Sequence, residues 1–257
     1  MRMLLTLLLL LSAACLAQAT PQERGTALAQ AADTRLHGYG DASVRLQMTL
    51  LNSKGDSATR ELRVQSLEVA EGERTLMVFE TPRDVAGTGL LSWNRRSGED
   101  EQWLYLPAVK RVKQIGGANK SGPFMGSEFA FEDIVTPFWQ KFSYRHLREE
   151  TLDGLACDVI ERTPLDARSG YRRQLVWIDR EQQLIRRIDY YDRRDTLLKT
   201  YTASDFHAHG GRHWRPAEMQ MVNHQTGKQT RLRWSDWRFG VGLAPDAFTQ
   251  GALQRVK

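Results

Sequence analysis

A strict alternation of apolar and polar side chains constrains the fold of this chain most. In residues 43–51 every second side chain is apolar, from Val44 to Leu50, which is the pattern of a strand with one buried face. An Asn-Ser-Lys-Gly turn at 52–55 follows, and residues 57–69 return as a second strand. Hairpins of this kind pair their strands antiparallel.

Strand-like segments of this kind continue through most of the chain. Short polar turns separate further strand-like segments, and Asp153-Gly154 and Thr226-Gly227 are typical hairpin signals. We count about 11 strands. Residues 22–37 have the apolar spacing of a helix that ends at Gly38, and short helices are expected near 107–115 and 131–140. The expected fold is mainly β with α, a strongly curved antiparallel sheet that wraps the N-terminal helix.

The first 19 residues resemble an export signal. A basic start at Met1-Arg2-Met3 precedes a leucine-rich run, and Ala17-Gln18-Ala19 is a cleavage site for signal peptidase. Cleavage after Ala19 leaves residues 20–257 as one domain in the periplasm. The alternative is a lipoprotein with Cys15 as the acylated residue, although Ser12 stands where the lipobox requires leucine. No second apolar run of about 18 residues provides a membrane anchor.

A curved sheet of this length has a concave apolar face larger than one short helix can fill. The remainder is packed by loops, left as a cavity or occupied by a ligand. For any single candidate lining residue, ordinary core packing is the favoured alternative, although methionine adapts well to varied apolar ligands. The candidates for the cavity wall and its lid are Leu46, Met48, Leu50, Met77, Trp103, Tyr105, Phe124, Met125, Phe129, Phe131, Met219, Met221 and Trp234.

Residues 101–134 carry the most informative local pattern. A strand with large apolar side chains runs into Pro107 and a short basic turn, and a loop rich in glycine, serine and asparagine follows. Because the glycines remove backbone restraint, we expect residues 116–127 to be mobile, with Phe124 and Met125 covering the opening of an empty cavity.

This segment also resembles a known family. The runs LYLPAVKRVK (104–113), FMGSEF (124–129) and FEDI (131–134) resemble the LolA-like outer-membrane lipoprotein-sorting proteins. Glu128 and Phe131 stand where the family pattern has Asp and Tyr, and both replacements are conservative. The resemblance implies a LolA/LolB-like incomplete β-barrel with a helical lid, a hydrophobic cavity for acyl chains and an association with RND-type inner-membrane exporters.

Charged residues suggest where recognition takes place. The formal net charge is +5, and no nucleic-acid-binding motif accompanies the basic residues. A carrier must release its cargo, so we expect no fixed charged clamp deep inside the cavity and polar recognition at its rim. The rim candidates are Lys110, Arg111 and Lys113, for which the alternative is a merely solvated turn.

Two functional classes remain open from the sequence. The first is a monomeric carrier that binds a lipid or acylated cargo, touches membrane surfaces transiently and works with an RND-type exporter. The second is an interaction module that docks on such an exporter with its cavity filled by its own side chains. We expect no catalytic residues, no cofactor and no metal site, since no spaced catalytic or ligand motif is present.

Overall fold

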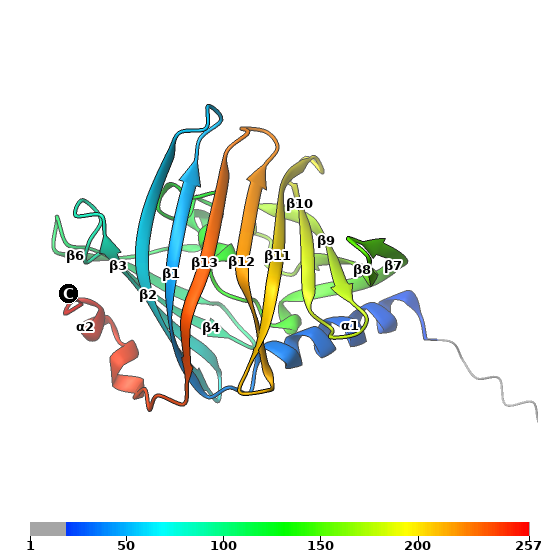
Figure 1. The fold of residues 1–257 in the computed structure, drawn as a ribbon, viewed down its shortest axis with the longest axis horizontal. Helices are drawn as coiled ribbons and strands as arrows, with labels where there is room; N and C mark the ends of the chain where they lie inside the picture. The colour runs from blue at the N-terminus through cyan, green and yellow to red at the C-terminus, as the bar shows by residue number, and fades with distance from the viewer. Residues whose placement is uncertain (1–18, 257) are drawn as a thin grey trace, which may run out of the picture.

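The computed structural model describes residues 19–256, so the predicted signal peptide up to residue 18, with Cys15, lies outside the described part. Within it, 13 strands form one antiparallel sheet in the order β6-β5-β4-β3-β2-β1-β13-β12-β11-β10-β9-β8-β7. The sheet curves strongly without closing, and β6 and β7 are its edges (Figure 1). The strands are β1 (Asp41–Leu51), β2 (Ser57–Val69), β3 (Gly72–Thr81), β4 (Gly89–Arg95), β5 (Glu101–Leu106), β6 (Arg111–Gln114), β7 (Phe142–Leu152), β8 (Leu155–Pro164), β9 (Tyr171–Asp179), β10 (Ile185–Asp192), β11 (Leu197–His209), β12 (His213–Asn223) and β13 (Gln229–Phe239).

The chain builds this sheet as two meanders. Strands β1 to β6 run outward to one edge, residues 115–141 cross to the other edge, and β7 to β13 return to the centre. There β13 pairs with β1, from Ala42 opposite Phe239 to Leu51 opposite Gln229. Each other pairing joins neighbours in sequence, which local patterns can predict. The β1–β13 pairing joins the two ends of the domain and makes one continuous concave face.

The predicted curved antiparallel sheet is confirmed, but the strand count and the short helices need correction. The sheet has 13 strands rather than about 11. Residues 107–110 form a turn that Lys110 closes with a φ of 52°, and 111–114 pair with β5 as β6, so no helix forms there. Between 131 and 140 single 3₁₀ turns replace the expected helix, because Pro137 interrupts a continuous helical hydrogen-bond pattern.

The N-terminal helix α1 (Pro21–Leu36) agrees with the predicted helix at 22–37. Thr20 and Glu23 form a reciprocal capping box at its start, and Pro21 occupies the first turn. The helix lies against β7 so closely that a Cβ on Gly25 would come within 2.8 Å of the His146 backbone nitrogen. None of the described helices is long and apolar enough to cross a membrane.

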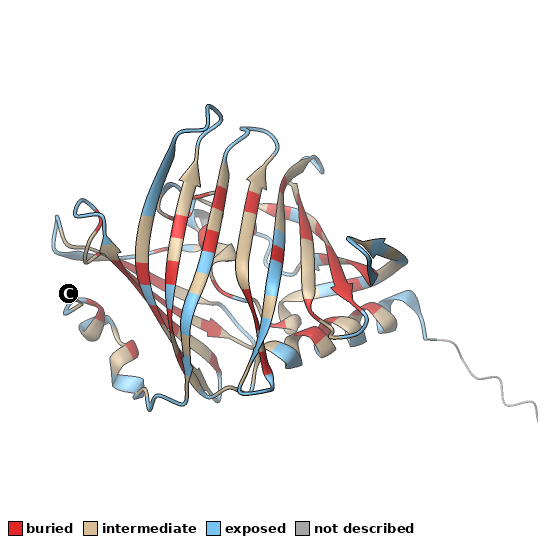
Figure 2. Cartoon of the chain, viewed as in Figure 1, coloured by how far each residue is buried: buried red, intermediate tan, exposed pale blue. Residues whose placement is uncertain are grey.

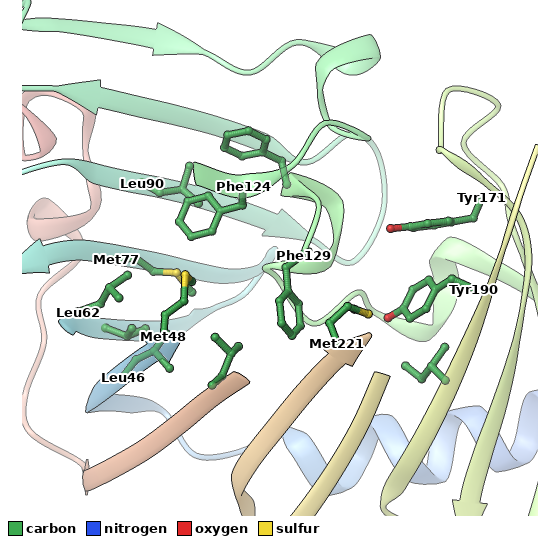
Figure 3. Close-up of a cluster of buried hydrophobic side chains, with 14 of the residues drawn as sticks. Leu46, Met48, Leu62, Met77, Leu90, Phe124, Phe129, Tyr171, Tyr190 and Met221 are labelled. Atoms are coloured by element: carbon green, nitrogen blue, oxygen red, sulfur yellow. The ribbon is translucent and has the colours of Figure 1, made fainter. Parts of the chain in front are cut away.

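Residues 115–141 fill part of the space inside the sheet. They contain four 3₁₀ turns, η1 (Gly117–Asn119), η2 (Phe124–Gly126), η3 (Phe131–Asp133) and η4 (Trp139–Lys141). Phe124 is fully buried, with its ring centroid 5.8 Å from that of Phe79, and Figure 3 shows it packed beside Leu90. Arg60 donates a hydrogen bond to the Met125 carbonyl. Phe124 is therefore a core residue, and the expectation that it covers an opening is wrong.

A smaller core lies on the opposite face of β3, β4 and β5. Here the C-terminal segment, with η5 (Pro245–Phe248) and α2 (Gln250–Leu253), packs over the outer side of the sheet. Phe248 and Leu253 are fully buried against Trp103. Figure 2 shows that β3 to β5 are buried over much of their length, while β1 and β13 alternate between buried and more exposed positions.

Candidate binding cavity

A cavity of about 730 Å³ lies on the concave side of the sheet. Strands β1 to β3 and β7 to β13 form its wall, α1 contributes Ala29, Ala32 and Leu36, and residues 117–141 border it from the interior. Strands β4 to β6 do not border it, because Phe124 and its neighbours fill that part of the concave face. This volume is within the range of roughly 300–1,000 Å³ that is usual for small-molecule sites.

Most of the wall is apolar. Several large apolar side chains border the cavity and stay partly exposed, so they offer contact surface to a ligand rather than to each other. They are Leu36, Ile134, Trp139, Phe142, Met219, Trp234 and Trp237.

Six of the predicted wall residues border this cavity: Leu46, Met48, Met77, Phe129, Met219 and Trp234. Leu46 is 1% exposed and Met48 is fully buried, so both pack into the wall behind the open space. Figure 3 shows Leu46, Met48 and Met77 in one cluster, with Phe129 beside them. Whether these residues bind a ligand stays a prediction.

The other predicted wall residues do not border the cavity. Leu50, Phe124, Met125, Phe131 and Met221 belong to the main core or pack against it. Trp103 and Tyr105 lie on the outer face of the sheet, where the C-terminal segment covers them. The assignment of Trp103 and Tyr105 to the cavity is wrong because of the geometry of β5. Side chains alternate in direction, and in this strand Leu104 is the one that joins the concave core.

Sequence reasoning missed a row of polar side chains across the concave face. Tyr144 on β7 lies opposite Arg162 on β8, Arg162 opposite Gln174 on β9, Gln174 opposite Tyr190 on β10, and Tyr190 opposite Lys199 on β11. Residues directly opposite in a sheet share a face. The position of Arg162, two residues after the buried Ile160, was the available signal in the sequence.

Arg162 and Lys199 have different partners in this row. Lys199 Nζ lies 2.7 Å from Asp133 Oδ2, and both side chains are at most 5% exposed. Arg162 is 8% exposed, and its Nε donates to Gln174 Oε1 at 2.6 Å while its guanidinium lies 4.5 Å from the Phe142 ring centre. Since Arg162 borders the cavity, the expectation that no fixed charge lies inside is wrong.

Burial affects several other polar groups of the cavity wall. Burial raises the pKa of the Tyr144 hydroxyl to about 12, although the charge of Arg162 opposes the shift. Burial also raises the pKa of Glu132, which accepts hydrogen bonds from Ser169 and the Gly170 backbone. Gln140 Oε1 and Trp234 Nε1 are buried and have no hydrogen-bond partner in the part of the chain that the structure describes. Among the described residues no group of His, Cys, Asp and Glu could hold a metal ion.

Two charged turns form the exposed border of the cavity. One joins β4 to β5 and includes Glu99 and Asp100, and the other joins β8 to β9 and includes Arg168. Lys141 Nζ lies 2.9 Å from Asp100 Oδ1, and Lys120 Nζ donates to the Asp100 carbonyl. We call this exposed border the mouth of the cavity. Its residues lie in loops that are far apart in sequence, which is why local patterns did not predict it.

The predicted rim residues lie elsewhere. Lys110, Arg111 and Lys113 belong to the β5–β6 hairpin, at the opposite end of β5 from Asp100, and they are exposed. None of them borders the cavity. Their placement at its rim is therefore wrong, while a role in contacting a partner stays a prediction.

Comparisons with known proteins agree on the architecture. The chain is similar to a protein from Vibrio parahaemolyticus that is described as an outer-membrane lipoprotein-sorting protein domain, with a TM-score of 0.89 and 43% identity over 91% of this chain and 100% of that one. It is also similar to a DUF1329 family protein from Desulfovibrio piger ATCC 29098, with a TM-score of 0.86, 31% identity and the same shares covered. A LolA superfamily protein from Nitrosomonas europaea is 20% identical over the same shares, and its TM-score of 0.73 shows a common fold.

A family model described as an uncharacterized protein matches residues 71–255. No curated protein matches the chain. The matched range contains strands β3 to β13 and residues 115–141 inside the sheet, and thus most of the cavity wall.

Proposed function

The chain belongs to the LolA-like family of outer-membrane lipoprotein-sorting proteins, and from this premise we propose that it is a periplasmic carrier that binds the acyl chain of a lipid or acylated cargo. The observation that carries the proposal is the apolar cavity of about 730 Å³ under α1. Binding there requires no covalent step. Apolar surface that the cargo would expose to water is instead buried against the sheet.

The construction of the cavity supports uptake and release. Its back wall is a continuous sheet, whereas its exposed border consists of turns joined by side-chain contacts. Exposed ion pairs contribute about 1 kcal/mol or less each. Loops can therefore separate at small cost while the sheet keeps its shape, as a carrier requires.

The place of action and the partner belong to the same proposal. The description of the Vibrio relative as an outer-membrane lipoprotein-sorting domain supports a periplasmic location for this chain. We propose that cargo moves between the inner and outer membranes with an RND-type exporter as partner. Lys110, Arg111 and Lys113 are exposed and remain candidates for contact with this partner or with an anionic membrane surface.

A binding assay with a neutral apolar dye tests the carrier function. N-phenyl-1-naphthylamine should bind the purified protein with roughly micromolar affinity, about −8 kcal/mol, and organic extraction should release co-purified lipid. Met219→Trp, which adds bulk to a wall position, should weaken dye binding at least about tenfold. Gln220→Trp is the matched control, because the neighbouring side chain points to the other face.

The alternative function would give a different result. An interaction module whose own side chains fill the space would bind no dye and release no lipid. Such a result, with a correctly folded protein, would refute the carrier function.

A further inference from the structure

Arg162 is a buried cation that lacks a counterion in the described part of the chain. It is 8% exposed, borders the cavity, and forms no ion pair with a carboxylate among the described residues. A buried charge without a partner is costly, and an arginine carries five N–H donors in a planar fork. Within residues 19–256 only Nε has a protein acceptor, the Gln174 side chain at 2.6 Å. The donors on the two terminal nitrogens have no acceptor among these residues and can bind one supplied by a ligand.

The other buried cations of the concave face differ from Arg162. Lys199 is neutralised by Asp133 and also donates to the Glu128 carbonyl at 2.8 Å. Arg215 donates to the backbone carbonyls of Leu36 and Trp214. Both cations therefore fasten elements of the fold to one another. Among the described residues, the Arg162 side chain hydrogen-bonds only to Gln174, and its guanidinium lies over the ring of Phe142.

Acidic groups near the polar row are already engaged. Asp133 accepts from Lys199, from the Tyr171 hydroxyl at 2.9 Å and from the Ala130 backbone at 2.7 Å. Glu132 accepts from Ser169 and Gly170. In their described contacts, therefore, neither carboxylate serves Arg162 as a counterion.

Further donors without acceptors face the same space. The hydroxyls of Tyr190 and Tyr201 form no hydrogen bond within the described part of the chain, and both residues border the cavity. Figure 3 shows the Tyr190 hydroxyl directed toward Met221 in the interior. A ligand that accepts hydrogen bonds would satisfy these groups together with Arg162.

An apolar row runs beside the polar one. Two residues away from Arg162 along β8 is Ile160, which lies opposite Val176 on β9, and Val176 lies opposite Ile188 on β10. All three residues border the cavity and are at most 6% exposed. The concave face thus places a cationic group next to a hydrophobic strip on the same strands.

We propose that the cargo is an acyl amphiphile with one anionic head group, and that Arg162 binds this head group inside the cavity. The acyl chain lies along the strip that begins at Ile160 and continues toward Trp234. A carboxylate or phosphate accepts two parallel hydrogen bonds from a guanidinium fork, which matches the free donors of Arg162. This inference rests on the proposed carrier function and narrows its cargo to anionic lipids.

Competition against N-phenyl-1-naphthylamine tests the head group. Laurate, dodecyl phosphate and dodecanol have equal chain lengths and differ in the head. Laurate or dodecyl phosphate should displace the dye from the wild-type protein at concentrations about ten- to a hundredfold lower than dodecanol, the usual range for a charge-assisted hydrogen bond. The stronger of the two anions identifies the head group as carboxylate or phosphate.

Variants of Arg162 locate the effect. Arg162→Gln should remove the advantage of the anions and leave dodecanol unchanged, whereas Arg162→Lys should retain part of it, because the charge remains without the fork. Arg172→Gln is the control, since Arg172 is exposed on the next strand and does not border the cavity. Thermal unfolding of each variant establishes that it is folded.

Two results would overturn the proposal. The first is equal displacement by laurate, dodecyl phosphate and dodecanol in the wild-type protein, which needs no variant to interpret. The second is an equal loss for all three ligands in Arg162→Gln. In both cases the dye still binds, so the carrier function survives, whereas absence of dye binding would refute that function itself.

Discussion

Arg168 Nη2 lies 2.7 Å from Glu99 Oε1, and this ion pair joins the two halves of the unclosed sheet. Glu99 belongs to the turn between β4 and β5, near the β6 edge, and Arg168 to the turn between β8 and β9, near the β7 edge. Both turns border the cavity. This contact, together with the Lys141–Asp100 ion pair, thus bridges the mouth where the backbone of the sheet leaves a gap.

Breaking this pair should speed ligand exchange without unfolding the protein. The two side chains are 43% and 70% exposed, so the pair contributes about 1 kcal/mol or less to stability. Glu99→Gln should increase the dissociation rate of the bound dye several-fold in stopped-flow measurements and shift the melting temperature by no more than about 2–4 °C. High salt should produce the same increase in the wild-type protein.

The double variant provides the control for this prediction. If Arg168 and Glu99 act on exchange through their mutual contact, Arg168→Gln combined with Glu99→Gln should exchange no faster than either single variant. If the two substitutions had additive effects on the dye dissociation rate, or if neither changed it, the ion pair would not control the opening of the mouth.

Two tryptophans on opposite faces of the sheet should separate stability from binding. Trp103 is 5% exposed under the C-terminal segment, whereas Trp234 borders the cavity. Trp103→Ala should cost about 3–5 kcal/mol in the free energy of unfolding and leave dye affinity intact. Trp234→Ala should weaken dye binding and destabilise less, because its side chain is only partly buried. The reverse pattern in urea unfolding and dye titration would contradict the assignment of faces.

A comparison of β1 with β5 shows how much of the sheet local sequence patterns can predict. Alternation at 43–51 correctly predicted which side chains of β1 face inward, because polar residues mark the outer face. In β5 the positions 103, 104 and 105 are all apolar, since both faces of this strand are covered. Periodicity cannot assign a face there, and the segment that covers Trp103 is about 145 residues away in sequence.

The row of polar side chains in the cavity depends on the register between neighbouring strands and not on the local sequence pattern. Arg162 acquires its neighbours Tyr144, Gln174 and Tyr190 from three further strands. Each strand was predictable, but the alignment between strands depends on bulges such as the one between His146 and Arg148. Hence the sequence predicted a curved sheet with an apolar interior and did not predict the cation within it.

The glycine-rich segment at 116–127 should be ordered around Phe124. The Phe124 backbone nitrogen donates to the Phe129 carbonyl at 2.7 Å, and the Ser127 nitrogen donates to the Phe124 carbonyl at 2.9 Å. These two amides should exchange with solvent as slowly as those of the central strands, and Phe124→Ala should cost about 3–5 kcal/mol. Fast exchange at both amides, unaffected by the dye, would instead favour the mobile lid expected from the glycine content.

The end of α1 should make stability depend on pH through His37. Burial alone would lower the pKa of His37, but its hydrogen bonds and ion pair with Asp33, 3.3 Å from Nδ1 to Oδ2, outweigh burial and raise the pKa above its ordinary value. The resulting stabilisation is complete below about pH 6.5 and is lost as the pH rises through the raised pKa. His209 and His213 oppose this trend, since burial lowers their pKa values.

A comparison with His37→Gln isolates this contribution. The difference in unfolding free energy between the wild-type protein and His37→Gln should be largest near about pH 5 and decrease toward about pH 9. Some difference should remain at high pH, because the imidazole also stacks on Phe138 with ring centroids 4.6 Å apart. Asp33→Asn should abolish the pH-dependent part and keep the stacking. A difference that stays constant across this range would show that His37 stabilises α1 through packing alone.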